Sequence, residues 1–184
     1  MRSFIAINLP AAVKNDIGEI VGRLRNAGPA ARWVPADNLH VTVKFLDEIS
    51  EDQVKPLLGA ITAASGQTHP FELQLGGFGF FPNERKSRVF WVGIESGFDM
   101  LKSLVHRIDH ETAPLGFDPE KRPFSAHITL ARLREPGPAG ALATAAARLD
   151  YHSEPIQVSE IDLMRSVLSP KGATYSVLGS VPLR

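Results

Sequence analysis

Two ten-residue stretches of this sequence, NLHVTVKFLD and SAHITLARLR, each carry a histidine and a threonine two positions apart in an apolar run. The four residues are His40, Thr42, His127 and Thr129. Side chains alternate between the two faces of a strand. Each stretch is therefore predicted to be a strand that buries apolar side chains on one face and presents its His and Thr on the other.

Two histidines and two hydroxyls at one place suit phosphodiester chemistry. Attack on phosphorus needs a base to deprotonate the nucleophile and an acid to protonate the leaving oxygen. Because imidazole has an unperturbed pKa of about 6.5, two histidines can share one proton near neutral pH. A threonine hydroxyl can donate to a nonbridging phosphate oxygen. The spacing alone does not say which histidine is the acid, and this scheme requires no metal or cofactor.

The composition limits the kind of protein. The 184 residues have 43% hydrophobic content, a net charge of zero and no cysteine. These numbers exclude disulfides, thiolate metal sites and a cysteine nucleophile, and they argue against a broad basic surface that grips long nucleic acid. Since no apolar stretch approaches the roughly 20 residues needed to span a bilayer, we expect no membrane association and a cytoplasmic protein.

The elements that must position the two motifs can be predicted from periodicity and turn signals. Strands are expected at SFIAINL, ARWV, FELQL and RVFWVGI, and a pair of strands around an SPKG turn near the end. Apolar residues at helical spacing and a capping box at Ser50 and Gln53 predict four helices. Their ranges are 11–26, 51–64, 98–112 and 139–149.

The order of these elements repeats. The two motif histidines lie 127 − 40 = 87 positions apart. At this offset Phe4 falls on Trp91, helix 11–26 falls on helix 98–112, and the helices that follow the motifs also coincide. The sequence therefore predicts a duplication. We expect residues 1–184 to form a single α+β domain with two lobes. Two antiparallel sheets flanked by helices would surround a central cleft that carries the paired His-x-Thr motifs.

The sequence resembles the 2H phosphoesterase superfamily, and specifically its RNA 2′,3′-cyclic phosphodiesterases, also called 2′-5′ RNA ligases. The resemblance extends over essentially the whole chain, and it is carried by RSFIAINLP, RWVPADNLHVTVKFLDE, KRPFSAHITLAR and LMRSVLSPKGATYSVL. It implies hydrolysis of RNA 2′,3′-cyclic phosphate ends to 2′-phosphomonoesters, and formation of 2′,5′ linkages between tRNA halves in some members. The partners it implies are such RNA ends or small cyclic nucleotides, with no protein partner. Asp47 stands where a glycine is common, and we expect only a surface effect there.

The resemblance also assigns roles to individual residues. His40 matches the proton donor to the leaving 3′ oxygen, and His127 matches the proton acceptor that activates water. Thr42 and Thr129 match phosphate-binding residues. Arg132 matches an arginine that contacts the nucleotide, and Phe45 matches a base-stacking residue. Strict alternation places Arg132 and Phe45 on the face away from the histidines, where Phe45 would be a core aromatic residue.

Two other classes of function are left open by the residues themselves. One is a non-catalytic RNA or nucleotide binding module, although binding alone would favour permanently charged Arg or Lys over paired histidines. The other is a metal-dependent hydrolase in which His106 or His110, four positions apart on a helix, joins His40 and His127. Loss of activity in EDTA would favour that class. The two helical histidines have no third local partner, so an exposed helix face is the expected interpretation.

Overall fold

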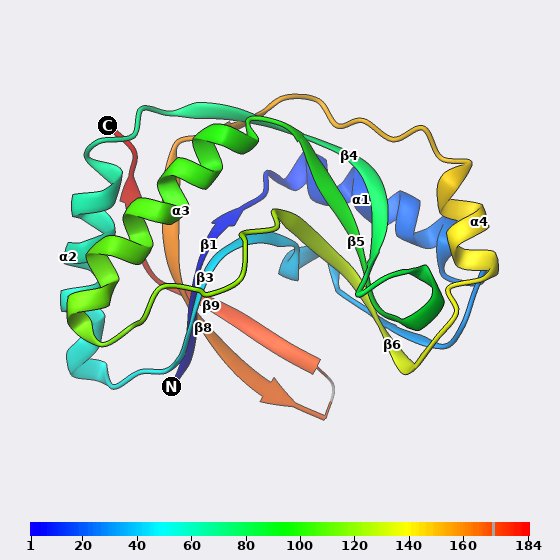
Figure 1. Cartoon of the computed structure of the whole chain (residues 1–184), viewed down its shortest axis with the longest axis horizontal. Coiled ribbons are helices and arrows are strands. Elements are labelled where there is room, and N and C mark those ends of the chain that lie inside the picture. The colour runs from blue at the N-terminus through cyan, green and yellow to red at the C-terminus, as the bar shows by residue number, and fades with distance from the viewer. Residues whose placement is uncertain (171) are drawn as a thin grey trace.

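The computed structural model describes residues 1–170 and 172–184 and contains two antiparallel sheets (Figure 1). The first sheet has the spatial order β3 (His40–Glu48), β1 (Arg2–Asn8), β8 (Glu160–Ser169) and β9 (Gly172–Pro182). The second has the order β2 (Ala31–Trp33), β6 (His127–Gly137), β5 (Ser87–Ser96), β4 (Phe71–Phe81) and β7 (Ile156–Val158). The predicted α+β fold with two antiparallel sheets is confirmed.

The helices divide between the sheets (Figure 1). α2 (Val54–Ser65) and α3 (Phe98–Thr112) pack together and contact strands of the first sheet, which makes the first lobe. α1 (Ala11–Leu24) and α4 (Ala141–Ala147) contact each other beside the second sheet, which makes the second lobe. Short 3-10 turns precede or follow these elements: η1 (Ala36–Asn38), η2 (Glu51–Gln53), η3 (Glu84–Lys86) and η4 (Ala113–Leu115).

Most helix bounds agree with the periodicity. The helix predicted over 98–112 has these bounds in the structure, and its buried side chains recur every three or four residues. The capping box at Ser50 and Gln53 is present, but its first turn is the 3-10 turn η2. The helices predicted over 11–26 and 139–149 are shorter at their ends than expected, as frayed termini often are.

The strand predicted at FELQL is longer than expected, because β4 continues through the glycine-rich segment to Phe81. Gly79 in this segment lies under the indole ring of Trp91 on β5. A Cβ atom at Gly79 would lie 2.2 Å from Cζ2 of that ring, so no larger residue fits. Gly79 therefore permits close packing of β4 against β5.

The duplication is confirmed, but the two halves exchange strands. β4, from the first half of the chain, pairs with β5 and joins the second sheet. β8, its counterpart in the second half, pairs with β1 and joins the first sheet. Similarly, α1 follows a strand of the first sheet but lies beside the second. Each lobe is thus built from both halves, and one continuous hydrophobic core spans them.

One detail of the predicted alignment is wrong. Asn8 on β1 pairs with His40, and Gly93 on β5 pairs with His127, so β1 and β5 correspond at 93 − 8 = 85 positions. Phe4 therefore corresponds to Val89 and not to Trp91. Because the error of two residues is even, it keeps the same side chains on the same face, which is why the apolar pattern matched at 87.

Within the described residues, no helix is long and apolar enough to cross a membrane.

Candidate active site

The first His-x-Thr strand contains a β-bulge directly after the motif. Thr42 pairs with Ala6 and Lys44 pairs with Ile5, so that Val43 has no partner on β1. A bulge inserts one residue into one strand and reverses the inside–outside order beyond it. Lys44 is accordingly 7% exposed and Phe45 is 65% exposed, the reverse of the alternation predicted from the sequence.

The second His-x-Thr strand contains a matching bulge. Thr129 pairs with Trp91 and Ala131 pairs with Phe90, which leaves Leu130 without a partner on β5. Leu130 lies 87 positions after Val43, so both bulges fall at the same place in the duplicated unit. Beyond the bulge Ala131 is buried and Arg132 is exposed.

The bulges place Phe45 and Arg132 on the same faces as the histidines. The opposite faces, which strict alternation predicts for both residues, are therefore wrong. Phe45 pairs with Phe4, which lies on the same face of β1 as the partners of Thr42 and His40. Arg132 pairs with Val89, on the face of β5 that also carries Trp91. Because directly paired residues point to the same side of a sheet, both side chains accompany the motifs.

The buried Lys44 side chain has a different role. Its Nζ atom forms a buried ion pair with the carboxylate of Asp109 on α3 and donates a hydrogen bond of 2.9 Å to the carbonyl of Asp118. Strict alternation along the strand would predict Lys44 on the exposed face of His40, and this prediction is wrong because of the bulge. The pair joins the first motif strand to the helix and loop that lead toward the second motif.

The imidazoles of His40 and His127 are held in the same way. Nδ1 of His40 donates to the carbonyl of Asn38 at 2.7 Å, and Nδ1 of His127 donates to the carbonyl of Ser125 at 2.7 Å. A carbonyl oxygen can only accept, so the proton of each neutral ring lies on Nδ1 and the lone pair lies on Nε2. Nε2 is therefore the atom through which each histidine can accept or deliver a proton.

The hydroxyl of Thr42 interacts with the reactive nitrogen of His40. Thr42 Oγ1 lies 3.0 Å from Nε2, where it donates to the neutral ring. A phosphate oxygen that approached this hydroxyl would compete for the same proton. Both rings are partly exposed, and β3 and β6 contact each other.

Aromatic rings surround both histidines, and the sequence patterns did not identify them as site residues. His40 lies against Phe4, with ring centroids 4.8 Å apart, and against Tyr175 of β9 at 5.3 Å. His127 lies against Phe81 at 4.8 Å and Trp91 at 6.2 Å. The pairing of each motif strand with its neighbour could have identified Phe4 on β1 and Trp91 on β5. Tyr175 comes from a strand that is distant in the sequence.

This environment lowers the pKa of both histidines. Burial is the largest cause of the lowered pKa of His40, opposed by its bond to Asn38 and reinforced by the charges of Lys14 and His127. Burial is also the largest cause for His127, opposed by the bond to Ser125 and reinforced by the charge of Arg132.

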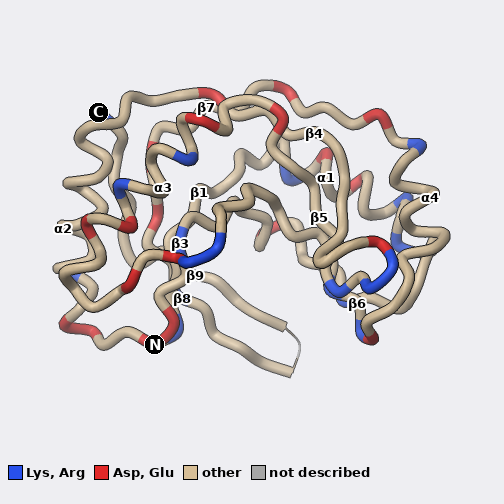
Figure 2. The backbone as a smooth tube through the Cα atoms, viewed as in Figure 1, with Lys and Arg blue, Asp and Glu red and all other residues tan. Residues whose placement is uncertain are grey.

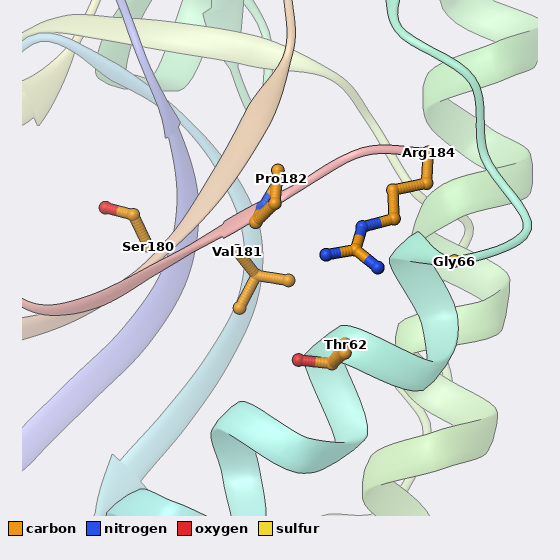
Figure 3. A pocket seen from close by; sticks show the side chains of 6 residues that line it. All are labelled: Thr62, Gly66, Ser180, Val181, Pro182 and Arg184. Carbon is orange, nitrogen blue, oxygen red and sulfur yellow. The ribbon is translucent and has the colours of Figure 1, made fainter.

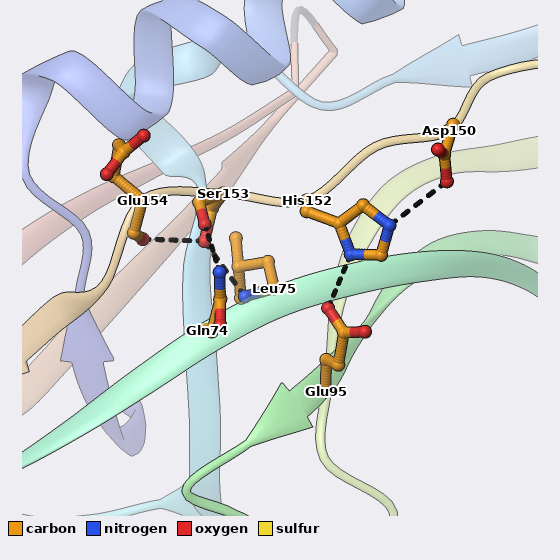
Figure 4. Close-up of polar contacts among 7 residues, drawn as sticks. All are labelled: Gln74, Leu75, Glu95, Asp150, His152, Ser153 and Glu154. Carbon is orange, nitrogen blue, oxygen red and sulfur yellow. Dashed lines mark hydrogen bonds and ion pairs between the residues drawn. The ribbon is translucent and has the colours of Figure 1, made fainter.

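Other histidines lie elsewhere. His106 and His110 are exposed on α3, where they border a hollow of about 340 Å³ together with Arg107. Residues 1–170 and 172–184 contain no group of three or more His, Asp or Glu placed to hold a metal ion. His152 lies between two carboxylates, with Nδ1 2.6 Å from Glu95 and Nε2 3.0 Å from Asp150 (Figure 4).

A second hollow, of about 190 Å³, lies between the end of α2 and the end of β9 (Figure 3). Its lining residues are Thr62, Gly66, Ser180, Val181, Pro182 and Arg184. None of these belongs to the two motifs or to their aromatic neighbours. The paired histidines therefore do not line this hollow.

The fold and the site define an α+β protein with two pseudo-symmetric histidines. Comparisons identify its family. The sequence model for LigT-like phosphoesterases matches twice, over residues 7–91 and 92–175, in agreement with the duplication. The chain therefore belongs to the LigT-like phosphoesterase family and is an enzyme of the hydrolase class.

Curated relatives cover nearly the whole chain. An RNA 2′,3′-cyclic phosphodiesterase of Methanothermobacter thermautotrophicus is 30% identical over 177 residues, which cover 96% of this chain and 95% of the relative. The RNA 2′,3′-cyclic phosphodiesterase of Thermus thermophilus is 34% identical over 193 residues, which cover 100% and 91%.

Solved structures share the fold over the same extent. The structure of TT0787 of Thermus thermophilus has a TM-score of 0.81 at 29% identity, and the match covers 100% of this chain and 98% of that one. Escherichia coli LigT in complex with 3′-AMP has a TM-score of 0.75 at 28% identity, with 99% and 97% covered.

Proposed function

We propose that this enzyme hydrolyses RNA ends that carry a 2′,3′-cyclic phosphate and leaves a 2′-phosphomonoester. The observation that carries the proposal is the matched hydrogen bonding of His40 and His127 through Nδ1, which makes Nε2 the basic nitrogen of each neutral ring. The names of the relatives support the substrate. Since each lobe contains strands from both halves, we also propose that residues 1–184 act as one domain.

The reaction assigns one proton transfer to each histidine. Nε2 of neutral His127 takes a proton from water as the water oxygen attacks phosphorus opposite the 3′ oxygen. The bond between phosphorus and the 3′ oxygen breaks, and Nε2 of protonated His40 gives its proton to that oxygen. The ester at the 2′ oxygen remains, and the two histidines return to their starting states through exchange with solvent.

The other proposed site residues bind the substrate. The hydroxyls of Thr42 and Thr129 donate to nonbridging phosphate oxygens, where negative charge increases during attack. Arg132 binds the nucleotide through its guanidinium group, and Phe45 stacks on a base. The bulges support the last two assignments, because they turn both side chains toward the face of the histidines.

The same chemistry extends to ligation. If a 5′ hydroxyl of a second RNA takes the place of water, His127 accepts its proton and the product carries a 2′,5′ linkage. We therefore propose that 2′,5′ ligation of RNA fragments such as tRNA halves accompanies hydrolysis. Adding an RNA with a free 5′ hydroxyl to the reaction should yield a longer, 2′,5′-linked product.

One assay tests the main proposal. An oligonucleotide that ends in a 2′,3′-cyclic phosphate is incubated with the enzyme in EDTA, and the product is identified by chromatography against 2′- and 3′-phosphate standards. We expect the 2′-phosphate. A 3′-phosphate product would reverse the assigned leaving oxygen, and loss of activity in EDTA would contradict a metal-independent reaction.

A further inference from the structure

A row of arginines continues outward from the catalytic face of the second sheet. Arg32 on the edge strand β2 pairs directly with Arg132 on β6, so both point to the same side of the sheet. Beyond the bulge the alternation resumes, with Arg132 and Arg134 exposed and Leu133 buried between them. This arginine row, defined as Arg32, Arg132 and Arg134, therefore lies on the face that carries His127.

The opposite side of the sheet supports this assignment. Trp33, next to Arg32, packs edge-on against the buried ring of Phe90, with ring centroids 6.0 Å apart. Trp33 and Phe90 both pair with Ala131, which is fully buried. Because neighbours along a strand point to opposite faces, Arg32 must point away from the core.

The arginine row has no anionic partner within the described part of the protein. Among the ion pairs of residues 1–170 and 172–184, none involves Arg32, Arg132 or Arg134. Side chains on neighbouring strands are about 4.8 Å apart and those two residues apart on one strand about 6.7 Å, so the three positive charges repel each other. Figure 2 shows further Lys and Arg, interspersed with acidic residues, where β6 passes the β4–β5 connection.

The first lobe has no such row at the equivalent place. At the offset of 87, Arg132 and Arg134 correspond to Phe45 and Asp47, and the next position is a glutamate in both lobes. Beyond the bulge, β3 therefore presents an aromatic ring and a carboxylate where β6 presents two guanidinium groups. A polyanion that reaches the two histidines would therefore be attracted more strongly to β6 than to β3.

We infer that Arg32 and Arg134 extend the contact of Arg132 into a binding subsite for the phosphodiester backbone on the 5′ side of the reacting phosphate. This inference rests on the proposed function. It makes oligonucleotide ends better substrates than cyclic mononucleotides, because only the former carry upstream phosphates. Guanidinium groups suit this ligand, since they bind phosphate oxygens in a bidentate manner.

The test compares two substrates across matched variants. The substrates are a 2′,3′-cyclic mononucleotide and an RNA trinucleotide that ends in the same nucleotide and cyclic phosphate. The variants are Arg32→Gln and Arg134→Gln, with Arg23→Gln as the control, since Arg23 is an exposed arginine on α1, beside the core face of the second sheet. For each protein, kcat/KM is measured with both substrates at several salt concentrations.

We expect the wild-type enzyme to prefer the trinucleotide by about tenfold or more, the effect of one or two charge-assisted hydrogen bonds. Each Gln variant should lower this ratio several-fold, and the control should keep it. The slope of log kcat/KM for the trinucleotide against log salt should become shallower by about 0.7 for each phosphate that the variant no longer binds.

Equal use of both substrates by the wild type, or a loss in the variants that is equal for both substrates, would overturn the subsite. Hydrolysis of neither substrate would instead refute the proposed function. In that case binding of a trinucleotide and a mononucleotide that carry 2′-phosphates, followed by fluorescence anisotropy, still tests the arginine row. A trinucleotide preference that Arg32→Gln removes would support the row, and equal affinities would refute it.

Discussion

Phe45 and Arg132 occupy equivalent positions, each three residues beyond a motif threonine and each turned toward a histidine by a β-bulge. The duplicated scaffold thus presents an aromatic ring on one lobe and a guanidinium group on the other. A nucleotide has matching parts, an apolar base and an anionic phosphate. The two bulges thus give a nearly symmetric fold an asymmetric surface beside the histidines.

Replacing these two residues should weaken substrate use without unfolding the protein. Base–aromatic stacking is worth about 1–3 kcal/mol, so Phe45→Ala should lower kcat/KM by about tenfold. Arg132→Gln removes a charge-assisted bond and should lower it by a similar factor or more. Since both side chains are exposed, urea unfolding should show wild-type stability within about 0.5 kcal/mol. A wild-type kcat/KM in either variant would contradict its place in the site.

The paired histidines should behave as one catalytic unit. His40→Ala and His127→Ala should each lower kcat by about 10² or more, because each removes one proton transfer. The double variant should be little slower than the slower single variant, since the roles depend on each other. Thr42→Ala and Thr129→Ala should have smaller effects, of about 1.5–3 kcal/mol in transition-state binding. A folded His127→Ala protein with near-normal turnover would end the two-histidine mechanism.

The pH dependence should reflect the lowered pKa values. Burial lowers the pKa of His40 and of His127 below 6.5, so the singly protonated pair exists mainly on the acidic side of that value. The profile of kcat/KM reports the free enzyme and should be bell-shaped with its alkaline limb below pH 6.5. A bound phosphate anion favours the protonated rings, so the profile of kcat should lie at higher pH. Coincident profiles centred above about pH 7 would contradict this account.

The same pKa shifts link stability to pH. The unfolded chain binds protons at its histidines near pH 6.5, whereas folded His40 and His127 bind them only at lower pH. The contribution of these two histidines to the free energy of unfolding is therefore fully present above about pH 6.5. It is lost as the pH falls through that value toward the folded pKa values. Substituting both residues with Gln should make the loss shallower, as measured by urea unfolding at about pH 7 and about pH 5.5.

The buried pair of Lys44 and Asp109 provides a stability prediction. Removing one partner of such a pair leaves a buried charge and typically costs about 3–5 kcal/mol. Lys44→Met should therefore lower the free energy of unfolding by an amount in this range, and adding Asp109→Leu should restore much of it. If the double variant is no more stable than Lys44→Met, the loss comes from packing and not from the unpaired carboxylate.

Asp47 stands where the family commonly has glycine, and its backbone conformation shows why glycine suits this position. It is exposed, as expected, and its φ of 54° lies in the left-handed region, which favours glycine. Relief of this strain is partly offset by the greater entropy of glycine in the unfolded chain. Asp47→Gly should thus stabilise the fold by about 0.5–1 kcal/mol in thermal unfolding with unchanged kcat. A lower Tm would contradict this explanation.

The sequence by itself determined the duplication, most helices and strands, and the two motifs that present His40, Thr42, His127 and Thr129. These features are local, because they depend on the period of apolar residues and on residues two positions apart. The tertiary structure decided the exchange of β4 and β8 between sheets, the aromatic neighbours of the histidines, and the faces of Phe45 and Arg132. A bulge arises from how a strand pairs with its neighbour, and alternation read along one strand carries no record of that pairing.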